Sequence, residues 1–264
     1  MDHIDQYKEQ QKTGWSNFFL LENITGTAAP RLVSFAGIKA GAEVVDVACG
    51  SGVVALTAAR AGAKATGVDL TPQLIARARE NAALMQIDVR WHEGDVEALP
   101  LPDASFDCVV SQFGHMFAPR PEVALQEMLR VLKPGGTIAF STWPPELFVG
   151  RSFTLMSTYS PPVPGVSSSA LWGDPNIVRE RLGAAVRDIT FARDVTHFQV
   201  LSPQHYQHFI EHNFGPASKL FATLNASDPA RSAQLRQETV DLAAQYFKDN
   251  TLRQDYLLTR AVKV

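Results

Sequence analysis

Acidic and small residues follow the ends of several predicted strands, and their types and spacing indicate a cofactor site. The first group is VVDVACGSG (Val44–Gly52), where one acid, Asp46, lies among apolar residues and precedes two glycines. Gly50 and Gly52 allow a sharp turn and a close approach of backbone N–H groups to a ligand, and a helix is predicted to begin directly after them. This order of residues predicts a ligand-binding turn between a strand and a helix.

Two further acids extend the predicted site toward an adenosine. Asp69 ends the second predicted strand, about 20 residues after the glycine turn, where an acid can accept hydrogen bonds from ribose hydroxyls. Asp95 follows the third predicted strand and can accept from an exocyclic amine, while the Val96 N–H faces a ring nitrogen. Together these residues predict a pocket for an adenosine-containing cofactor.

Asp46 discriminates between two cofactor classes. The run GSGVVA (Gly50–Ala55) matches the G-x-G-x-x-A pattern of dinucleotide-binding turns, but that pattern alone is weak. A pyrophosphate on this turn would be repelled by Asp46, whereas the ammonium and sulfonium of S-adenosylmethionine would be attracted. At about 4 Å and an effective dielectric of about 20, that charge pair is worth about 4 kcal/mol before desolvation. The acid therefore favours S-adenosylmethionine, and an NAD(P)-dependent oxidoreductase remains the alternative.

Alternating strands and helices position these residues. Strands are predicted at 43–48, 64–69, 88–92, 106–111 and 137–142, with helices at 53–61, 72–85 and 121–132 between them. This alternation predicts a mostly parallel sheet covered on both faces, with ligands bound at the carboxyl ends of the strands. Two later strands, near 187–194 and 254–262, are expected to close one edge of the sheet as a hairpin. Helices near 203–213 and 229–248 are expected to form an insertion or cap.

Four motifs over about residues 40–145 resemble the class I S-adenosylmethionine-dependent methyltransferases, and most of all the branch with the ubiquinone/menaquinone C-methyltransferases and many small-molecule enzymes. They are VVDVACGSG, GVDL, EGDVEALPLPDASFD and RVLKPGG. The resemblance implies an α/β fold, a doubly wound Rossmann-like sheet of seven mostly parallel strands whose last strand is antiparallel, with a helical insertion or cap. This sequence differs from the family pattern at Ala48, where the family often has glycine.

The resemblance also implies a role for each matching residue. Asp46, Gly50 and Gly52 would surround the methionine part of S-adenosyl-L-methionine, Asp69 the ribose, and Asp95 with Val96 the adenine. The full set of expected cofactor-binding residues is Asp46, Ala48, Cys49, Gly50, Gly52, Asp69, Leu70, Gly94, Asp95, Val96, Ser111, Gln112 and Phe113. His115, after the fourth strand, is the candidate catalytic base, with packing in the loop as the alternative role. Cys49 is expected to be a small turn residue rather than a reactive thiol.

The whole chain, 1–264, is predicted to form a single methyltransferase domain. A cofactor-binding core covers about 30–145, a substrate or cap insertion about 146–250, and the C-terminal sheet edge 251–264. The expected function is methyl transfer to a small, apolar or aromatic metabolite, with S-adenosyl-L-homocysteine as the product. A catalytically silent methyltransferase-like binding protein is the second alternative.

Composition argues against several other classes. The net charge is −3 with no long basic run, so no nucleic-acid partner is expected. No apolar run is long enough to span a membrane, the polar N-terminal residues are unlike a signal peptide, and two cysteines predict no disulfide framework. A cytoplasmic enzyme with a small-molecule acceptor is therefore expected, and a homodimer is the form of assembly considered. No metal is expected: His205, His208 and His212 share a helix face but have no acidic or cysteine partner nearby.

Overall fold

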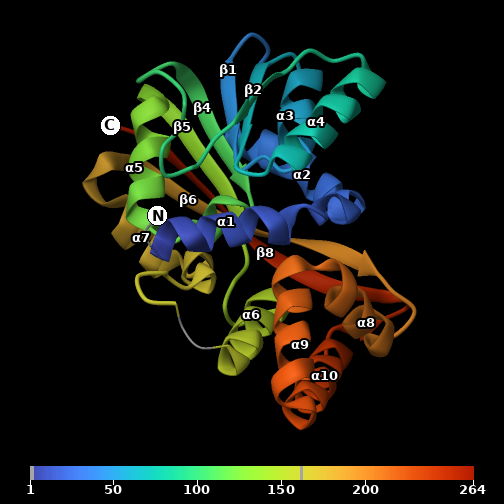
Figure 1. Cartoon of the computed structure of the whole chain (residues 1–264). Helices are drawn as coiled ribbons and strands as arrows, with labels where there is room; N and C mark the ends of the chain where they lie inside the picture. The colour runs from blue at the N-terminus through green and yellow to red at the C-terminus, as the bar shows by residue number, and fades with distance from the viewer. Residues whose placement is uncertain (1–2, 161–162) are drawn as a thin grey trace.

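A mixed β-sheet forms the centre of the computed structural model, which describes residues 3–160 and 163–264 (Figure 1). Its strands lie in the order β3-β2-β1-β4-β5-β8-β6, and β7 pairs with β8 beside this path. The strands are β1 (Glu43–Val47), β2 (Lys64–Asp69), β3 (Arg90–Glu93), β4 (Phe106–Gln112), β5 (Leu132–Thr142), β6 (Val186–Gln199), β7 (Phe247–Lys248) and β8 (Thr251–Lys263).

The predicted fold class is confirmed, with one correction to the strand count. Strands β1 to β5 are parallel to one another, and β8 runs antiparallel between β5 and β6. The described residues form eight strands rather than the predicted seven. The extra strand, β7, arises because Asp249 and Asn250 both adopt positive φ, at 49° and 59°. This is the geometry of a tight two-residue hairpin, which folds β7 back on the start of β8.

Helices cover the sheet and build a cap beyond one end of it (Figure 1). Several of them have proline in the first turn, where the backbone N–H has no partner within the helix and is not needed. At three of these starts, the side chains of Asp174, Ser202 and Asp228 cap the helix by accepting a backbone N–H. The helices are α1 (His3–Trp15), α2 (Glu22–Ala36), α3 (Val53–Arg60), α4 (Pro72–Met85), α5 (Pro121–Val131), α6 (Phe148–Tyr159), α7 (Pro175–Leu182), α8 (Pro203–Asn213), α9 (Gly215–Ser227) and α10 (Pro229–Ala244), with short 3-10 turns η1 (Phe18–Leu21), η2 (His115–Phe117), η3 (Ser169–Gly173) and η4 (Gly183–Ala185).

The cap stands on the β6–β8 ribbon. Strand β5 pairs only with residues 257–262 of β8, whereas residues 251–256 pair with β6, and at their start with β7, and extend past β5. Helices α6, α8, α9 and α10 pack around this extension and enclose a second apolar core, which includes Phe148, Phe198 and Phe221. Both strands are longer than the sequence predicted, and helices α6 and α9 were not predicted.

Helix α1 connects the cap with the sheet. In Figure 1 it lies between the two, across the carboxyl ends of the strands. Its Gly14 packs so closely on Gly215 of α9 that an added Cβ on Gly215 would lie 1.7 Å from the Gly14 carbonyl oxygen. No helix in the described ranges is both long and apolar enough to cross a membrane.

Candidate active site

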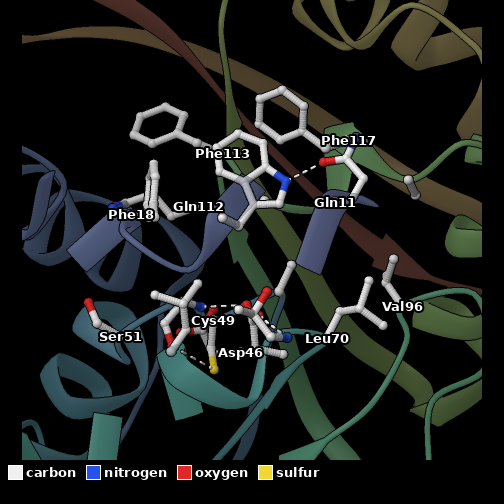
Figure 2. Close-up of a pocket in the computed structure, with 18 of the residues that line it drawn as sticks. Gln11, Phe18, Asp46, Cys49, Ser51, Leu70, Val96, Gln112, Phe113 and Phe117 are labelled. Atoms are coloured by element: carbon white, nitrogen blue, oxygen red, sulfur yellow. Dashed lines mark hydrogen bonds between the residues drawn. The ribbon is translucent and has the colours of Figure 1, made fainter. Parts of the chain in front are cut away.

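A pocket with about 990 Å³ of space between atoms, part of it open to solvent, lies at the carboxyl ends of β1, β2 and β4, where the predicted segments converge (Figure 2). In Figure 2, Asp46, Cys49 and Ser51 lie on one side of it, and Phe18, Gln112 and Phe113 on the opposite side. Most of the predicted cofactor-binding residues line it, namely Asp46, Ala48, Cys49, Gly50, Asp69, Leu70, Gly94, Asp95, Val96, Gln112 and Phe113. The structure therefore gathers the end of each motif around one cavity.

Asp46 is a buried acid with one uncommitted oxygen. Asp46 is 1% exposed, and its Oδ2 accepts the Ala55 N–H at 3.0 Å. Its Oδ1 is buried and has no hydrogen-bond partner in the part of the chain that the structure describes. The pKa of Asp46 is raised to about 8, mainly by burial; the Ala55 bond lowers it and the nearby charge of Asp69 raises it. A cationic donor would satisfy this oxygen and stabilise the ionised carboxylate.

Gln112 offers a second uncommitted acceptor on the neighbouring strand. Its Nε2 donates to the Thr25 carbonyl at 2.7 Å, while its Oε1 is buried and unpartnered within the described residues. Strand β4 pairs with β1, with Asp46 opposite Val110, so both acceptors lie at the same end of the sheet. An ammonium group carries three donors and no acceptor, and these two oxygens suit it. The amino-acid end of S-adenosylmethionine has such a group.

Asp69 holds the glycine turn in place. Its Oδ2 accepts the Gly50 N–H and its Oδ1 accepts the Thr71 N–H, both at 2.8 Å. Burial raises the pKa of Asp69, although the two backbone bonds act in the opposite direction. Each carboxylate oxygen has capacity for more than one hydrogen bond. Asp69 can therefore position the turn and still accept from hydroxyl groups in the pocket.

Helix α1 covers the Asp95 side of the pocket, which the sequence analysis missed. Lys8 Nζ lies 2.5 Å from Asp95 Oδ2 and 2.6 Å from Glu97 Oε2, and Asp95 Oδ1 accepts the Glu97 N–H. Lys8, Gln11 and Trp15 all line the pocket from this helix. Their spacing of three and four positions places them on one helix face, which is the signal the sequence contained. Buried Glu97 also accepts from Arg120, so the loop is fixed on both sides.

Gly52 and Ser111, which were both predicted to bind the cofactor, do not line the pocket. Gly52 has a φ of +84°, and an added Cβ would lie 2.5 Å from the Trp91 ring, so it permits close helix–strand packing. The Ser111 hydroxyl donates to the Val47 carbonyl at 2.6 Å and accepts the His115 N–H at 3.2 Å. Both residues shape the turns that surround the pocket.

His115 is also outside the pocket, which contradicts its candidate role as a base acting there. It is fully buried against Phe140 and Trp172, with 4.6 Å between the ring centroids in each case. Burial lowers the pKa of His115 to about 3, with a smaller contribution from the Arg181 charge. The turn η2 directs the residue into the core instead of toward the strand ends, so the neutral ring packs with aromatic neighbours.

Cys49 and the histidines of α8 have local roles. Burial raises the pKa of the Cys49 thiol well above its ordinary value, which makes it a poor nucleophile. His205 Nδ1 accepts the Leu201 N–H, and His212 Nδ1 is hydrogen-bonded to the His208 carbonyl. Over residues 3–160 and 163–264, no group of three His, Cys, Asp or Glu side chains has a geometry suited to a metal ion.

A second cavity, of about 880 Å³, adjoins the first and lies under the cap. The two share one wall, formed by Trp15, Phe18, Thr25, Phe113 and Phe117. Its remaining lining is mostly aromatic and aliphatic, including Trp143, Phe153, Phe198, Tyr206, Phe209 and Phe214. No carboxylate, histidine, lysine or arginine of the described chain lines it. The arrangement therefore places an apolar chamber beside the pocket formed by the motifs.

Two pocket residues have an unusual backbone conformation. Ala48 and Phe113 have φ values of 53° and 60°, in the left-handed region that side chains other than glycine rarely adopt. The Phe113 ring stacks on Trp143 with centroids 3.9 Å apart, so packing holds its strained conformation. The shared wall between the two cavities is thus rigidly positioned.

Known proteins similar to this chain include methyltransferases, and that similarity covers the region of the four motifs. The family model described as a methyltransferase domain matches residues 45–140. Over 248 residues the chain is 37% identical to an uncharacterized protein of Mycobacterium tuberculosis (strain H37Rv), covering 92% of this chain and 89% of the relative. It is 39% identical over 117 residues to a demethylmenaquinone methyltransferase of Thermus thermophilus, covering 44% of this chain and 53% of that enzyme.

A solved structure has the same fold. A putative methyltransferase from Bacillus halodurans superposes with a TM-score of 0.60 and 19% sequence identity, covering 90% of this chain and 99% of the other. At this identity the likeness concerns the fold alone.

Proposed function

The chain belongs to the class I S-adenosylmethionine-dependent methyltransferases, and from that premise we propose that it methylates a small, apolar or aromatic metabolite. The observation that carries the proposal is the wall shared by the two cavities. A cofactor in the first cavity and an acceptor in the second would meet where both cavities border Phe113 and Phe117. The aromatic lining of the second cavity suits a flat apolar molecule.

We assign the first cavity to the cofactor. Asp46 Oδ1 and Gln112 Oε1 would accept from the ammonium, Asp69 from the ribose hydroxyls, and Asp95 with the Val96 N–H would bind the adenine. When bound, S-adenosylmethionine supplies a methyl group on a positively charged sulfur. The ionised form of Asp46 opposes a pyrophosphate at the same position, which disfavours the dinucleotide alternative.

The chain positions the acceptor and excludes water from it. The lining of the second cavity offers no carboxylate or histidine that could remove a proton, and His115 is buried elsewhere. In-line positioning of two reactants supplies much of the rate of such a transfer. These features favour an acceptor atom that needs no protein base, such as carbon or sulfur.

A cavity-filling variant tests this assignment. Val149 lines the second cavity but not the first, so Val149→Trp should block the acceptor and leave the cofactor pocket unchanged. We expect loss of methyl transfer from labelled S-adenosylmethionine across a panel of aromatic metabolites, with the Kd for S-adenosylhomocysteine retained. Leu84→Trp, at a residue that is highly exposed, is the matched control and should retain activity.

Two results would overturn the proposal. Full activity in Val149→Trp would mean that the acceptor binds elsewhere. Cofactor binding by the wild-type chain without turnover of any aromatic acceptor would favour a catalytically silent binding protein.

A further inference from the structure

One amide interrupts the apolar face of β8. Leu252, Gln254 and Tyr256 are all buried on this strand, because side chains two positions apart share a face. Leu252 and Tyr256 belong to the two apolar cores, whereas Gln254 lines the second cavity and is only 7% exposed. Its amide has no hydrogen-bond partner among the described residues. A buried amide without a partner destabilises the folded chain, so its presence in this register calls for a ligand.

Thr239 repeats the pattern on a cap helix. It lies on the buried face of α10, is 5% exposed and lines the same cavity. Helical threonines usually bond to the carbonyl one turn earlier, as Thr57 does to Val53 at 2.7 Å and Thr223 to Lys219 at 2.9 Å. Thr239 makes no such bond within the described ranges. Its hydroxyl therefore remains available to a molecule in the cavity.

Thr25 and Ser152, which also line this cavity, already have partners. Thr25 is hydrogen-bonded to the Leu21 carbonyl at 3.1 Å, and Ser152 to the Phe148 carbonyl at 2.8 Å. Burial raises the pKa of Tyr206, and the interaction of its hydroxyl with Ser152 lowers it. Gln254 and Thr239 thus provide uncommitted hydrogen-bonding groups of the described cavity lining, together with the indole N–H of Trp143 beside Phe113.

We infer that the acceptor is a neutral aromatic molecule with an oxygen substituent, a carbonyl or hydroxyl, which Gln254 and Thr239 bind. The inference rests on the proposed function. The substituent is neutral because no charged side chain of the described chain lines the cavity. The Tyr256 ring meets Phe113 of the shared wall edge-on, with centroids 5.5 Å apart, and Gln254 lies two positions further along β8. The oxygen therefore lies at the end of the acceptor remote from the cofactor.

A pair of probes of nearly equal shape tests the inference. Equilibrium dialysis of 2-naphthol and 2-methylnaphthalene against the full chain with S-adenosylhomocysteine compares a hydroxyl with a methyl group. We expect about tenfold tighter binding of 2-naphthol to the wild-type chain. Gln254→Leu should abolish this preference and Thr239→Val should reduce it. Gln237→Leu, on the exposed face of α10, is the matched control and should preserve it.

Thermal unfolding without any ligand provides an independent readout. Gln254→Leu should melt at the same temperature as the wild type or higher, because leucine fits between Leu252 and Tyr256 without an unpartnered amide. A clear fall in melting temperature would overturn the inference, since it would mean that the amide has a structural partner.

The binding results distinguish a failure of this inference from a failure of the proposed function. Equal binding of both probes would overturn this inference and leave the acceptor cavity standing. Failure of both probes to bind the wild-type chain would contradict the assignment of the cavity to the acceptor, and the inference with it.

Discussion

Lys8 Nζ lies 2.5 Å from Asp95 Oδ2, and this contact ties helix α1 to the loop assigned to the adenine. Lys8 also reaches Glu97, whose side chain is fully buried. A ligand in the first pocket would lie beneath Gln11 and Trp15 of the same helix. We therefore expect α1 to move when the cofactor is released, and the Lys8 contacts to oppose that movement.

Lys8→Met should accelerate cofactor release. Hydrogen bonds to charged groups contribute about 1.5–3 kcal/mol, so their loss predicts a rise of about tenfold or more in the dissociation rate of S-adenosylhomocysteine. Stopped-flow displacement measures this rate. Lys12→Met is the matched control, because Lys12 pairs with Glu9 of its own helix and should leave the rate unchanged. Equal rates in wild type and Lys8→Met would mean that α1 does not retain the cofactor.

Asp46→Asn should change how the stability of the cofactor-free protein depends on pH. The pKa of Asp46 is about 8 in the folded chain and about 4 when unfolded, so between these values only the folded state holds the proton. The free energy of unfolding then falls as pH rises through this window, by about 1.4 kcal/mol per pH unit from this group. Urea unfolding from pH 5 to 8 should show a shallower fall in the variant, with Asp69 still contributing. An identical slope would contradict a protonated Asp46.

His115→Met should affect stability in acid and leave catalysis intact. The folded pKa is about 3 and the unfolded value about 6.5, so the unfolded state alone takes up the proton between them. The wild type should lose about 1.4 kcal/mol per pH unit from this group as pH falls through the window, and the variant should not. Its kcat should stay within about threefold of wild type, since removal of a general base costs about 10²–10⁴. A loss of that size in the folded variant would restore His115 as the base.

Ala48→Gly should stabilise the turn beneath the cofactor. Ala48 has a φ of 53°, a left-handed conformation that costs a non-glycine residue about 1–2 kcal/mol. Glycine removes this cost but loses about 0.5–1 kcal/mol of conformational entropy, so a net gain of about 0.5–1 kcal/mol is expected. Ala76→Gly, at an exposed position inside α4, is the control and should lose about 1 kcal/mol. A lower free energy of unfolding in urea for Ala48→Gly would contradict the proposed backbone strain at Ala48.

The sheet and the cofactor pocket could be predicted because their signals are local. A strand with Asp46 near its end, followed by Gly50 and a helix start, indicates both the element types and the edge of the sheet where the pocket lies. The same holds for Asp69, whose acceptor position at the end of β2 follows from the sequence. What the sequence did not reveal is that Asp69 already holds the Gly50 and Thr71 N–H groups.

Long-range contacts were beyond the sequence analysis. Lys8 and Asp95 are 87 residues apart, and nothing in either segment indicates the other. Gln254 is polar in an apolar register, but only the cap helices show that it borders a cavity. His115 follows a strand end as a catalytic residue would, yet the η2 turn directs it into the core. Gly52 resembles a ligand-binding glycine, and the position of Trp91 explains its packing role instead.

Calorimetric titration of the wild-type chain with S-adenosylhomocysteine and, separately, with NAD⁺ tests the central claim most directly. The account predicts one S-adenosylhomocysteine bound per chain, weakened in Asp46→Asn, and no measurable binding of NAD⁺. Binding of NAD⁺ without binding of S-adenosylhomocysteine would contradict the assignment of the pocket.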